Sequence, residues 1–298
     1  MLKTLFQSPS ALMSGLVLAL VLAAAVLAPW LSPYDASDLA AFDIADANLP
    51  PAWFEEGSRA HLLGTDDQGR DLLSAVLSGT RLSLAIGVTA ALLSLVLGVS
   101  AGLAAGYAGG ACDAIIMRLC DAMLAFPTLL TALLVDGVLR TMLGESAGDT
   151  AGETTAYAVL LIAMTVTGWV PYARTVRGLA RTKRSAEFVC AAKLSGVSEP
   201  LILVRHVLPN VMGPVFVLGA LNLSAAVMTE ATLSFLGVGV PPTTPSLGTL
   251  IRIGNDFIFS GEYWIALFPS AVLAATVLSV NLLGDRLRDA VNPVLREG

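Results

Sequence analysis

Long stretches without a charged residue constrain this chain more than any other feature. Five such stretches lie between Lys3 and Asp35, Arg81 and Asp113, Glu153 and Arg174, Arg205 and Glu230, and Glu262 and Asp285. A bilayer core about 30 Å thick is crossed by roughly 20 apolar residues in a helix. Each stretch therefore predicts one membrane-spanning helix.

The composition indicates the same class of protein. The chain is 55% hydrophobic and 13% charged, with a mean hydropathy of +0.76, whereas soluble domains carry about 25% charged residues. Continuous apolar runs favour helices, because barrel strands alternate in segments of about ten residues. We therefore predict an all-α integral membrane protein.

A sixth span is expected at 119–139. Asp121 and Asp136 shorten its uncharged stretch, but the sequence LAFPTLLTALLV between them is apolar enough to insert. The six transmembrane helices are thus predicted near 11–31, 82–108, 119–139, 155–172, 211–230 and 264–284.

The first apolar run has two interpretations, a cleaved signal peptide or a retained anchor helix. Lys3 precedes it, and small residues follow its centre, as in a signal peptide. However, the run from Ala11 to about Leu31 is longer than the 7–15 residues of a signal-peptide core. We expect a retained helix.

Basic residues predict the orientation, because cytoplasmic loops carry an excess of Lys and Arg. With the N-terminus inside, 12 of the 17 basic residues are cytoplasmic and 16 of the 23 acidic residues are external. The cytoplasmic set is Lys3, Arg118, Arg174, Arg177, Arg181, Lys183, Arg184, Lys193, Arg205, Arg286, Arg288 and Arg296. Both termini are therefore expected in the cytoplasm. The low pI of 4.9 reflects the acidic outer face and gives no indication of nucleic-acid binding.

This topology divides the chain into four regions. Residues 1–31 hold the cytoplasmic N-terminus and first helix, and residues 32–78 form an external region. Residues 79–285 form a five-helix core with a cytoplasmic loop at 173–210, and 286–298 form a cytoplasmic tail.

Motifs for catalysis and cofactor binding do not occur in the sequence. There is no HExxH, GxSxG or GxxxxGK[ST] pattern, and His61 and His206 fall on opposite sides of the membrane. Cys112, Cys120 and Cys190 lie at cytoplasmic ends, where thiols stay reduced, and lack metal-ligand spacing. We predict no catalytic residue, no cofactor and no metal in this chain.

The positions of ionisable residues disfavour an ion-coupled secondary transporter. Such transporters place carboxylates or histidines inside the membrane as relays, whereas Asp121, Asp136 and Glu230 lie near the ends of the predicted spans. Neutral ion sites on broken helices would still be compatible with the sequence.

Small and polar residues mark further features of the spans. Gly98, Gly102, Gly106 and Gly110 recur every four residues, which predicts one shared helix face that a neighbouring helix approaches closely. That neighbour could belong to this chain or to a second subunit. Polar residues on the last two spans could line a path, but interhelical hydrogen bonds are favoured; they are Asn222, Ser224, Thr229, Ser279 and Asn281.

Two external segments are rich in turn-forming residues. Gly64, Thr65, Asp66, Gly69, Arg70 and Asp71 belong to a motif with glycine near both ends. It could contact a partner protein, but a folded cap over the first two helices is favoured. Thr243, Thr244 and Pro245 predict a short re-entrant or surface element, because Pro241 and Pro242 prevent helix continuation.

The internal loop between Tyr172 and Asn210 combines seven basic residues with apolar positions at helical spacing. Gly196 interrupts the pattern, and a second short segment is expected to stop at Pro209. We predict two short amphipathic helices at an angle. They could lie on lipid headgroups or serve as a docking surface for an energy-converting protein.

The second of these interpretations is favoured by a resemblance. Cys190-Ala191-Ala192-Lys193-Leu194-Ser195-Gly196 followed by Val207-Leu208-Pro209 resembles the EAA loop of ABC importer permeases. Cys190 stands where that pattern has an acidic residue. Glu187 lies three residues earlier on a similar helix face, and we hypothesise that it substitutes.

Other segments resemble the second permease subunit of the peptide/nickel importer family over nearly the whole chain. They are PPAWFEEGSRAHLLGTDDQGRD, GGACDAIIMRLCDAMLAFP, GWVPYARTVRG, EATLSFLGVGVPPTTPSLGTLI and FPSAVLAATVLSVNLLGDRLRDAVNP. The first is most similar to the dipeptide branch, although oligopeptide, glutathione and nickel relatives share much of the pattern.

The resemblance implies a type I ABC importer fold in the bacterial cytoplasmic membrane. It also implies a homologous second permease subunit, two cytoplasmic ABC ATPase subunits that bind ATP and Mg, and an extracytoplasmic peptide-binding protein. A secondary transporter and a membrane scaffold or insertase remain as alternatives from other classes.

Overall fold

The computed structural model describes every residue except 1–8, 37, 39–41, 144–148, 241–242 and 292–298. The described part is helical apart from one isolated antiparallel bridge between Thr65 and Asp71. The α-helices are α2 (Pro9–Leu31), α3 (Leu72–Ala108), α4 (Gly110–Ala125), α5 (Thr128–Leu143), α6 (Asp149–Lys183), α7 (Glu187–Leu194), α8 (Glu199–Ile202), α9 (Leu208–Phe235), α10 (Leu247–Phe257) and α11 (Trp264–Val291).

Five helical segments are long and apolar enough to cross a membrane, and a bent pair makes up to six. The five are Pro9–Leu31, Leu72–Ala108, Thr154–Lys183, Glu199–Phe235 and Trp264–Asp289. Several extend well past the predicted spans, because a helix does not end where the hydrocarbon ends. α3 begins ten residues before the predicted span, at the point where Asp71 caps its first turn.

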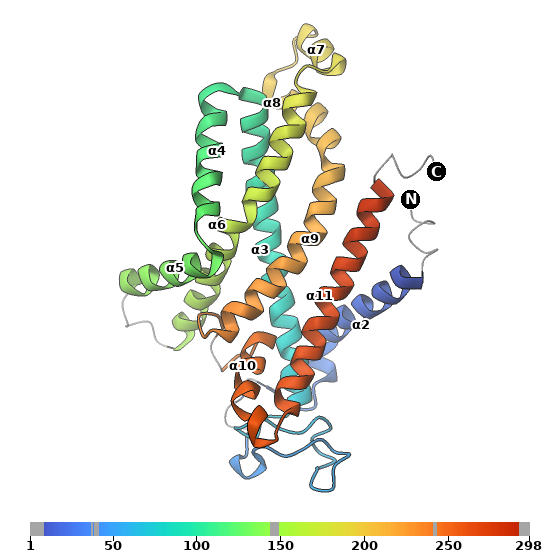
Figure 1. The fold of residues 1–298 in the computed structure, drawn as a ribbon, viewed down its shortest axis with the longest axis vertical. Coiled ribbons are helices and arrows are strands. Elements are labelled where there is room, and N and C mark those ends of the chain that lie inside the picture. The colour runs from blue at the N-terminus through green and yellow to red at the C-terminus, as the bar shows by residue number, and fades with distance from the viewer. Residues whose placement is uncertain (1–8, 37, 39–41, 144–148, 241–242, 292–298) are drawn as a thin grey trace.

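The predicted continuous helix at 119–139 is wrong. The chain is broken at Phe126 and Pro127 into α4 and α5, and the two apolar pieces are bent by 93°. Phe126 is extended (φ −102°, ψ 126°), as expected for a residue before proline. α5 therefore turns away from the direction of α4 and lies at one side of the bundle, next to α6 (Figure 1).

α3 lies at the centre of the helix bundle. It packs against α6, α9 and α2, and α11 packs against α9, α10 and α2 (Figure 1). Arg286 on α11 donates a hydrogen bond of 3.0 Å to the Ser10 hydroxyl on α2. The described start of α2 and end of α11 therefore lie side by side.

The second short segment of the internal loop does not stop at Pro209. α8 continues through a π-helical turn, η3 (Leu203–Val207), directly into α9. In this turn the Leu208 amide donates to the Leu203 carbonyl. Pro209 occupies the first turn of α9, where its missing N–H costs little.

One helix was absent from the sequence-based expectation. α10 follows Thr243–Pro245, begins at the N-cap Ser246 and is buried along Leu247, Gly248, Thr249 and Leu250. It packs against α9, α11 and α3 at the end of the bundle opposite α7 (Figure 1). Pro241 and Pro242 lie outside the described residues.

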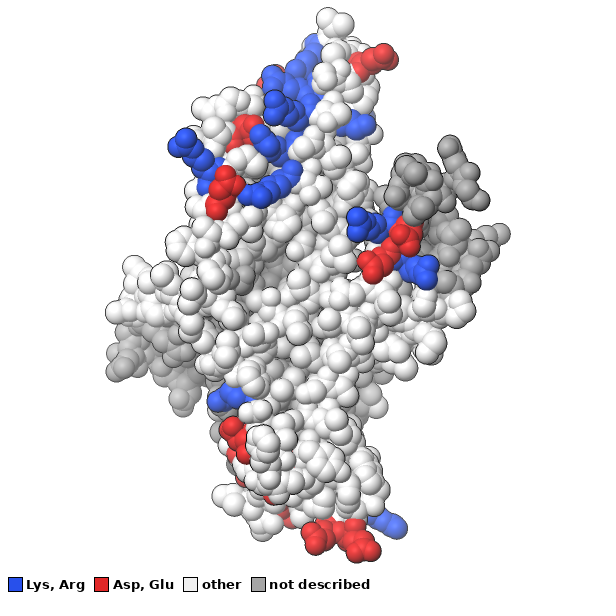
Figure 2. Space-filling model, in the orientation of Figure 1, with Lys and Arg blue, Asp and Glu red and all other residues white. Residues whose placement is uncertain are grey.

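Charge is distributed unequally between the two ends of the bundle. Figure 2 shows Lys and Arg gathered around α7 and α8 and acidic side chains at the opposite end. The uncharged band between them matches the apolar spans. This polarity is what a membrane-spanning bundle requires.

Candidate functional sites

α7 has one buried face and one exposed face. Val189 is fully buried and Ala192 is 7% exposed, whereas Glu187, Cys190 and Ala191 are exposed. Leu194 is 91% exposed, which is unusual for a leucine unless another surface covers it. α7 thus presents an acid, a thiol and apolar side chains at the tip of the molecule (Figure 1).

The buried face of α7 belongs to a core that extends into the membrane bundle. Val189 and Ala192 join a buried cluster with side chains from α3, α6, the α8–η3 segment and α9, namely Val99, Leu103, Tyr107, Tyr172, Val176, Ala180, Ile202, Val207, Val211 and Val215. α7 is therefore joined to the spans through this shared buried core, and within it α7 packs mainly against α8 and η3.

A glycine and two cations fix the position of α7. Gly196 has φ +76°, a left-handed conformation that glycine adopts without strain, and it turns the chain between α7 and α8. Lys193 Nζ lies 5.0 Å, and Arg184 Cζ 5.9 Å, from the ring centre of Tyr107 at the end of α3. These cation–π contacts join the loop to α3.

Two ion pairs join α4 to α6 near the same end. Arg177 donates from Nε and Nη2 to the two carboxylate oxygens of Asp113, and Arg174 donates to Asp121. The Arg177 pair is bidentate and only partly exposed, the geometry in which such pairs are strongest.

Three of the four predicted glycines bring α3 and α6 into close contact. A Cβ on Gly102 would lie 2.6 Å from the Ala173 carbonyl oxygen, and one on Gly106 would lie 2.5 Å from that of Arg177. Gly98 faces the Trp169 carbonyl in the same way. The close neighbour is therefore within this chain.

Gly110 does not share that face, contrary to the prediction. α3 ends at Ala108, and Gly109 and Gly110 both have positive φ. A Cβ on Gly110 would meet nothing within 4 Å. The four-residue spacing fails here because the helix ends before it reaches Gly110.

The external motif folds inward on itself. Thr65, Asp66, Arg70 and Asp71 are each at most 4% exposed. Asp71 caps α3 by accepting from the Ser74 amide at 2.8 Å and hydroxyl at 2.6 Å. Its other carboxylate oxygen lies 3.1 Å from His61 Nδ1. Gly64 and Gly69 have φ of +84° and +78° and provide the turns.

Asp66 and Arg70 form the buried centre of this motif. Asp66 accepts hydrogen bonds from the amides of Gln68 and Arg70, at 3.0 and 2.9 Å. Burial raises the pKa of the Asp66 carboxyl above its ordinary value, although the Arg70 guanidinium and these amides oppose the rise. Burial likewise lowers the pKa of Arg70.

The polar residues of the last two spans have different surroundings. Ser224 on α9 donates to the Val277 carbonyl of α11 at 3.4 Å, which is an interhelical bond, and Asn222 donates to Leu218 in its own helix. Asn222 and Thr229 also line a cavity of about 160 Å³ between α3, α6 and α9, with Ser94 and Thr167. Ser279 is buried and Asn281 partly buried.

Glu230 is a feature that the sequence reasoning missed. The sequence places it near the end of a predicted span, but α9 continues to Phe235 and Glu230 is fully buried. Ser234 donates to it at 2.8 Å, and Ser83 and Ser246 are further hydrogen-bonding neighbours. Glu230 thus lies where α3, α9 and the start of α10 meet.

Cysteines and metal ligands give no sign of a reactive centre in the described part. Cys112, Cys120 and Cys190 are free thiols, of which Cys120 is buried and Cys190 exposed. No group of three His, Cys, Asp or Glu residues in the described ranges could hold a metal ion.

Comparison with known proteins identifies the family. A model described as "Binding-protein-dependent transport system inner membrane component" matches residues 98–297, two thirds of the chain. The chain belongs to this family. A second model, for the "N-terminal TM domain of oligopeptide transport permease C", matches residues 1–51 of the permease. With its five or six apolar spans, the permease is a multi-pass protein of the bacterial inner membrane.

Curated relatives match over nearly the full length of this permease. It is 37% identical to the dipeptide transport system permease protein DppC of Haemophilus influenzae, over 98% of this chain and 93% of that one. It is 40% identical to the protein of the same name from Escherichia coli, over 95% of this chain and 89% of that one. The oligopeptide transport system permease protein OppC of Bacillus subtilis is 37% identical, over 98% of this chain and 88% of that one.

A solved structure supports the type I importer fold of the permease. A chain of the MetNI methionine ABC transporter, in inward-facing conformations, superposes with a TM-score of 0.55, covering 73% of this chain and 96% of that one. The sequence identity is 17%, so the likeness is one of fold.

Proposed function

We propose that this permease forms half of the translocation path of an ATP-driven importer of dipeptides or oligopeptides. A homologous permease supplies the other half, and an extracytoplasmic binding protein delivers the peptide. ATP and Mg are bound by two cytoplasmic ATPase subunits, and no residue of this chain is catalytic. The peptide substrate is supported by the names of the relatives, which are dipeptide and oligopeptide permeases.

The observation that carries this proposal is the two-faced α7. Its exposed face, with Glu187, Cys190 and Leu194, fits a groove on an ATPase, while Val189 and Ala192 fasten it to the core of the spans. A short helix held in a groove is a common recognition mode. Closure of the ATPase dimer would pull on α7, and the shared core would pass the motion to α3, α6 and α9.

Glu187 is proposed to supply the acid that the EAA pattern places at Cys190. Both side chains are exposed and lie three residues apart on α7, so they face the same direction. Ala191 lies beside them, and Gly196 and Pro209 shape the turn and the return into α9.

Co-purification of the ATPase subunits with affinity-tagged permease tests this assignment. The Glu187→Gln variant is expected to lose at least about ten-fold in ATPase binding, since a charge-assisted hydrogen bond contributes about 1.5–3 kcal/mol. Glu199→Gln, the same change at an exposed acid on α8 outside the docking face of α7, is the matched control and should bind normally. Undiminished binding by Glu187→Gln would refute the role of Glu187. Absence of any ATPase from the wild-type purification would count against the importer as a whole.

Substrate choice needs a separate test, because a nickel chelate or glutathione fits the same family. Binding of dipeptides, longer peptides, glutathione and nickel chelates to the binding protein of this transporter would be measured by calorimetry. Peptide binding alone supports the proposal. Uptake that follows an ion gradient and persists without ATP would instead indicate a secondary transporter.

The external motif is proposed to act as a cap that closes the outer ends of the first helices. The side chains of Thr65, Asp66, Arg70 and Asp71 are buried among the residues of the cap and the start of α3, and therefore offer little surface to a partner. Alanine substitution at exposed Arg59 should leave uptake unchanged, whereas substitution of buried Asp66 should lower the yield of folded protein.

A further inference from the structure

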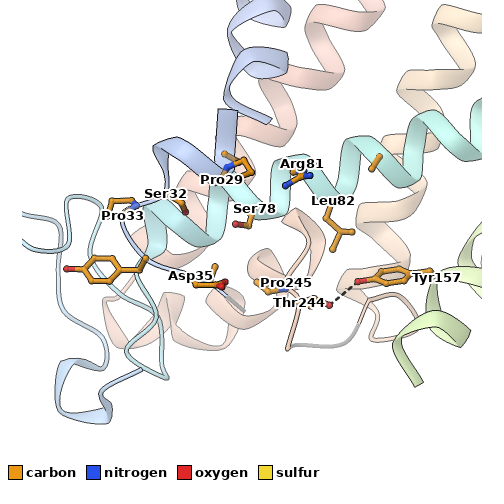
Figure 3. A pocket seen from close by; sticks show the side chains of 14 residues that line it. Pro29, Ser32, Pro33, Asp35, Ser78, Arg81, Leu82, Tyr157, Thr244 and Pro245 are labelled. Carbon is orange, nitrogen blue, oxygen red and sulfur yellow. Dashed lines mark hydrogen bonds between the residues drawn. The ribbon is translucent and has the colours of Figure 1, made fainter. Parts of the chain in front are cut away.

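A cavity of about 540 Å³ lies near the outer end of the bundle, apart from α7 and from the small cavity around Asn222. It is formed where the end of α2, the first third of α3, the start of α6 and the segment before α10 meet (Figure 3). Tyr157 on α6 and Thr244 close one side, with their hydroxyl oxygens 3.1 Å apart.

The cavity lies at the level of the membrane surface. Arg81 is the last charged residue before the long uncharged stretch of α3, and it therefore marks the outer edge of the hydrocarbon. Pro29 and Ser32, at the end of α2, line the same cavity. Neighbouring Trp30 is 76% exposed, as is typical of tryptophans at a membrane interface.

The polar part of the cavity suits an oxyanion. Among the described residues that line the cavity, the basic one is Arg81. Its side chain is exposed, and no ion pair to it occurs in the part of the chain that the structure describes. The hydroxyl groups of Ser32 and Ser78 lie on the same side of the cavity in Figure 3. A guanidinium flanked by hydroxyl donors matches a phosphate or a carboxylate.

The apolar surroundings separate these two anions. Ala85, Val88 and Leu92 follow Arg81 at intervals of about one helical turn, and all three are exposed. They form a strip that descends from the cavity along α3 towards the membrane centre. An acyl chain of a lipid can follow such a strip along its length and cover its apolar side chains, whereas a carboxylate group has no apolar part that would cover them.

We propose that this cavity binds an outer-leaflet phospholipid, with the headgroup phosphate on Arg81 and one acyl chain along Ala85, Val88 and Leu92. The bilayer supplies this lipid at the depth where the cavity opens. The site is independent of the peptide that the importer carries.

Native mass spectrometry tests the site by measuring the phospholipid that stays bound to the tagged permease complex. The complex is purified in mild detergent from cells rich in phosphatidylethanolamine. The Arg81→Gln variant is expected to retain at least about ten-fold less bound phospholipid than wild type, as for loss of a charge-assisted contact. Arg81→Lys should retain an intermediate amount. Arg252→Gln changes another arginine near the outer end that does not line the cavity, and should match wild type.

A second variant guards against misfolding of the charge variant. Ala85→Trp leaves Arg81 intact but fills the apolar strip, and it should also displace the lipid. Equal lipid retention by wild type and Arg81→Gln would overturn the proposal, as would equal loss from Arg81→Gln and Arg252→Gln. Lipid retained with a raised KM for peptide uptake in Arg81→Gln would instead assign the cavity to the peptide.

Discussion

At the scale of single residues, three glycines determine how closely α6 approaches α3. Gly102→Ala is expected to destabilise the permease by about 1–3 kcal/mol, because its Cβ would lie 2.6 Å from the Ala173 carbonyl oxygen. Gly178→Ala on α6 is the matched control, since its Cβ would meet nothing within 4 Å and alanine favours helix. Thermal unfolding in detergent should show a lower midpoint for the first variant only. Equal midpoints would mean that α3 and α6 separate without cost.

Asp71 is a second residue whose contacts make a defined prediction. Its carboxylate caps α3 through Ser74 and contacts His61. Asp71→Ala should cost about 1 kcal/mol or more, since it removes an N-cap and leaves buried donors without their acceptor. Asp71→Asn keeps an oxygen for the cap and should cost less. Thermal unfolding of both variants shows which of them loses more stability. An Asp71→Asn variant that is less stable than Asp71→Ala would contradict the capping role.

At the scale of elements, the sequence predicts spans better than it predicts where helices bend. A stretch without charged residues indicates where a helix can cross the membrane, because a charged side chain inside the bilayer is costly wherever the rest of the chain lies. The break at Phe126 has a local signal in Pro127, which disfavours a helical conformation at the residue before it, but a search for uncharged stretches does not use that signal. Pro209 is the reverse case, because a π-turn lets the helix continue through a residue that predicts its end. The same reasoning explains Gly110, where spacing alone does not reveal that α3 has ended.

The candidate site likewise has features that local sequence predicts and features that depend on distant segments. Helical spacing in the sequence predicts α7 and the turn at Gly196, since both are local properties. Burial of Glu230 was not predictable, because it arises where segments far apart in the sequence meet. Helix α10 does have a local start signal, the N-cap Ser246, which a search for long uncharged stretches does not use. Ser83 on α3 and Ser246 before α10 surround a carboxyl from α9, and no local pattern connects these residues.

The attachment of α4 to α6 gives a prediction for a pair of elements. Arg177 and Asp113 form a bidentate ion pair between these helices. A double-mutant cycle with Arg177→Ala and Asp113→Ala should show a coupling of about 0.2–1 kcal/mol, because partly exposed pairs are screened by water. Unfolding midpoints of the four proteins provide the measurement. Strictly additive effects would indicate that the pair does not stabilise the α4–α6 contact.

At the scale of the whole molecule, the two ends of the bundle differ in charge. Basic side chains gather around α7 and acidic ones around the cap and α10 (Figure 2). The described start of α2 and end of α11 adjoin each other. If the positive end faces the cytoplasm, it satisfies the rule for basic loops and would present α7 to the proposed ATPase subunits. Both described helix ends would then face the cytoplasm together.

This orientation is testable with the native cysteines. Cys190 is exposed on α7, whereas Cys120 is buried. In intact spheroplasts a membrane-impermeant maleimide should leave Cys190 unmodified. In inverted membrane vesicles stripped of the ATPase subunits, which would otherwise cover α7, it should label Cys190 but not Cys120. A cysteine in place of exposed Arg59, in a chain whose native cysteines are serine, should give the opposite pattern. Labelling of Cys190 in intact spheroplasts would invert the topology, and α7 would then be out of reach of any cytoplasmic ATPase.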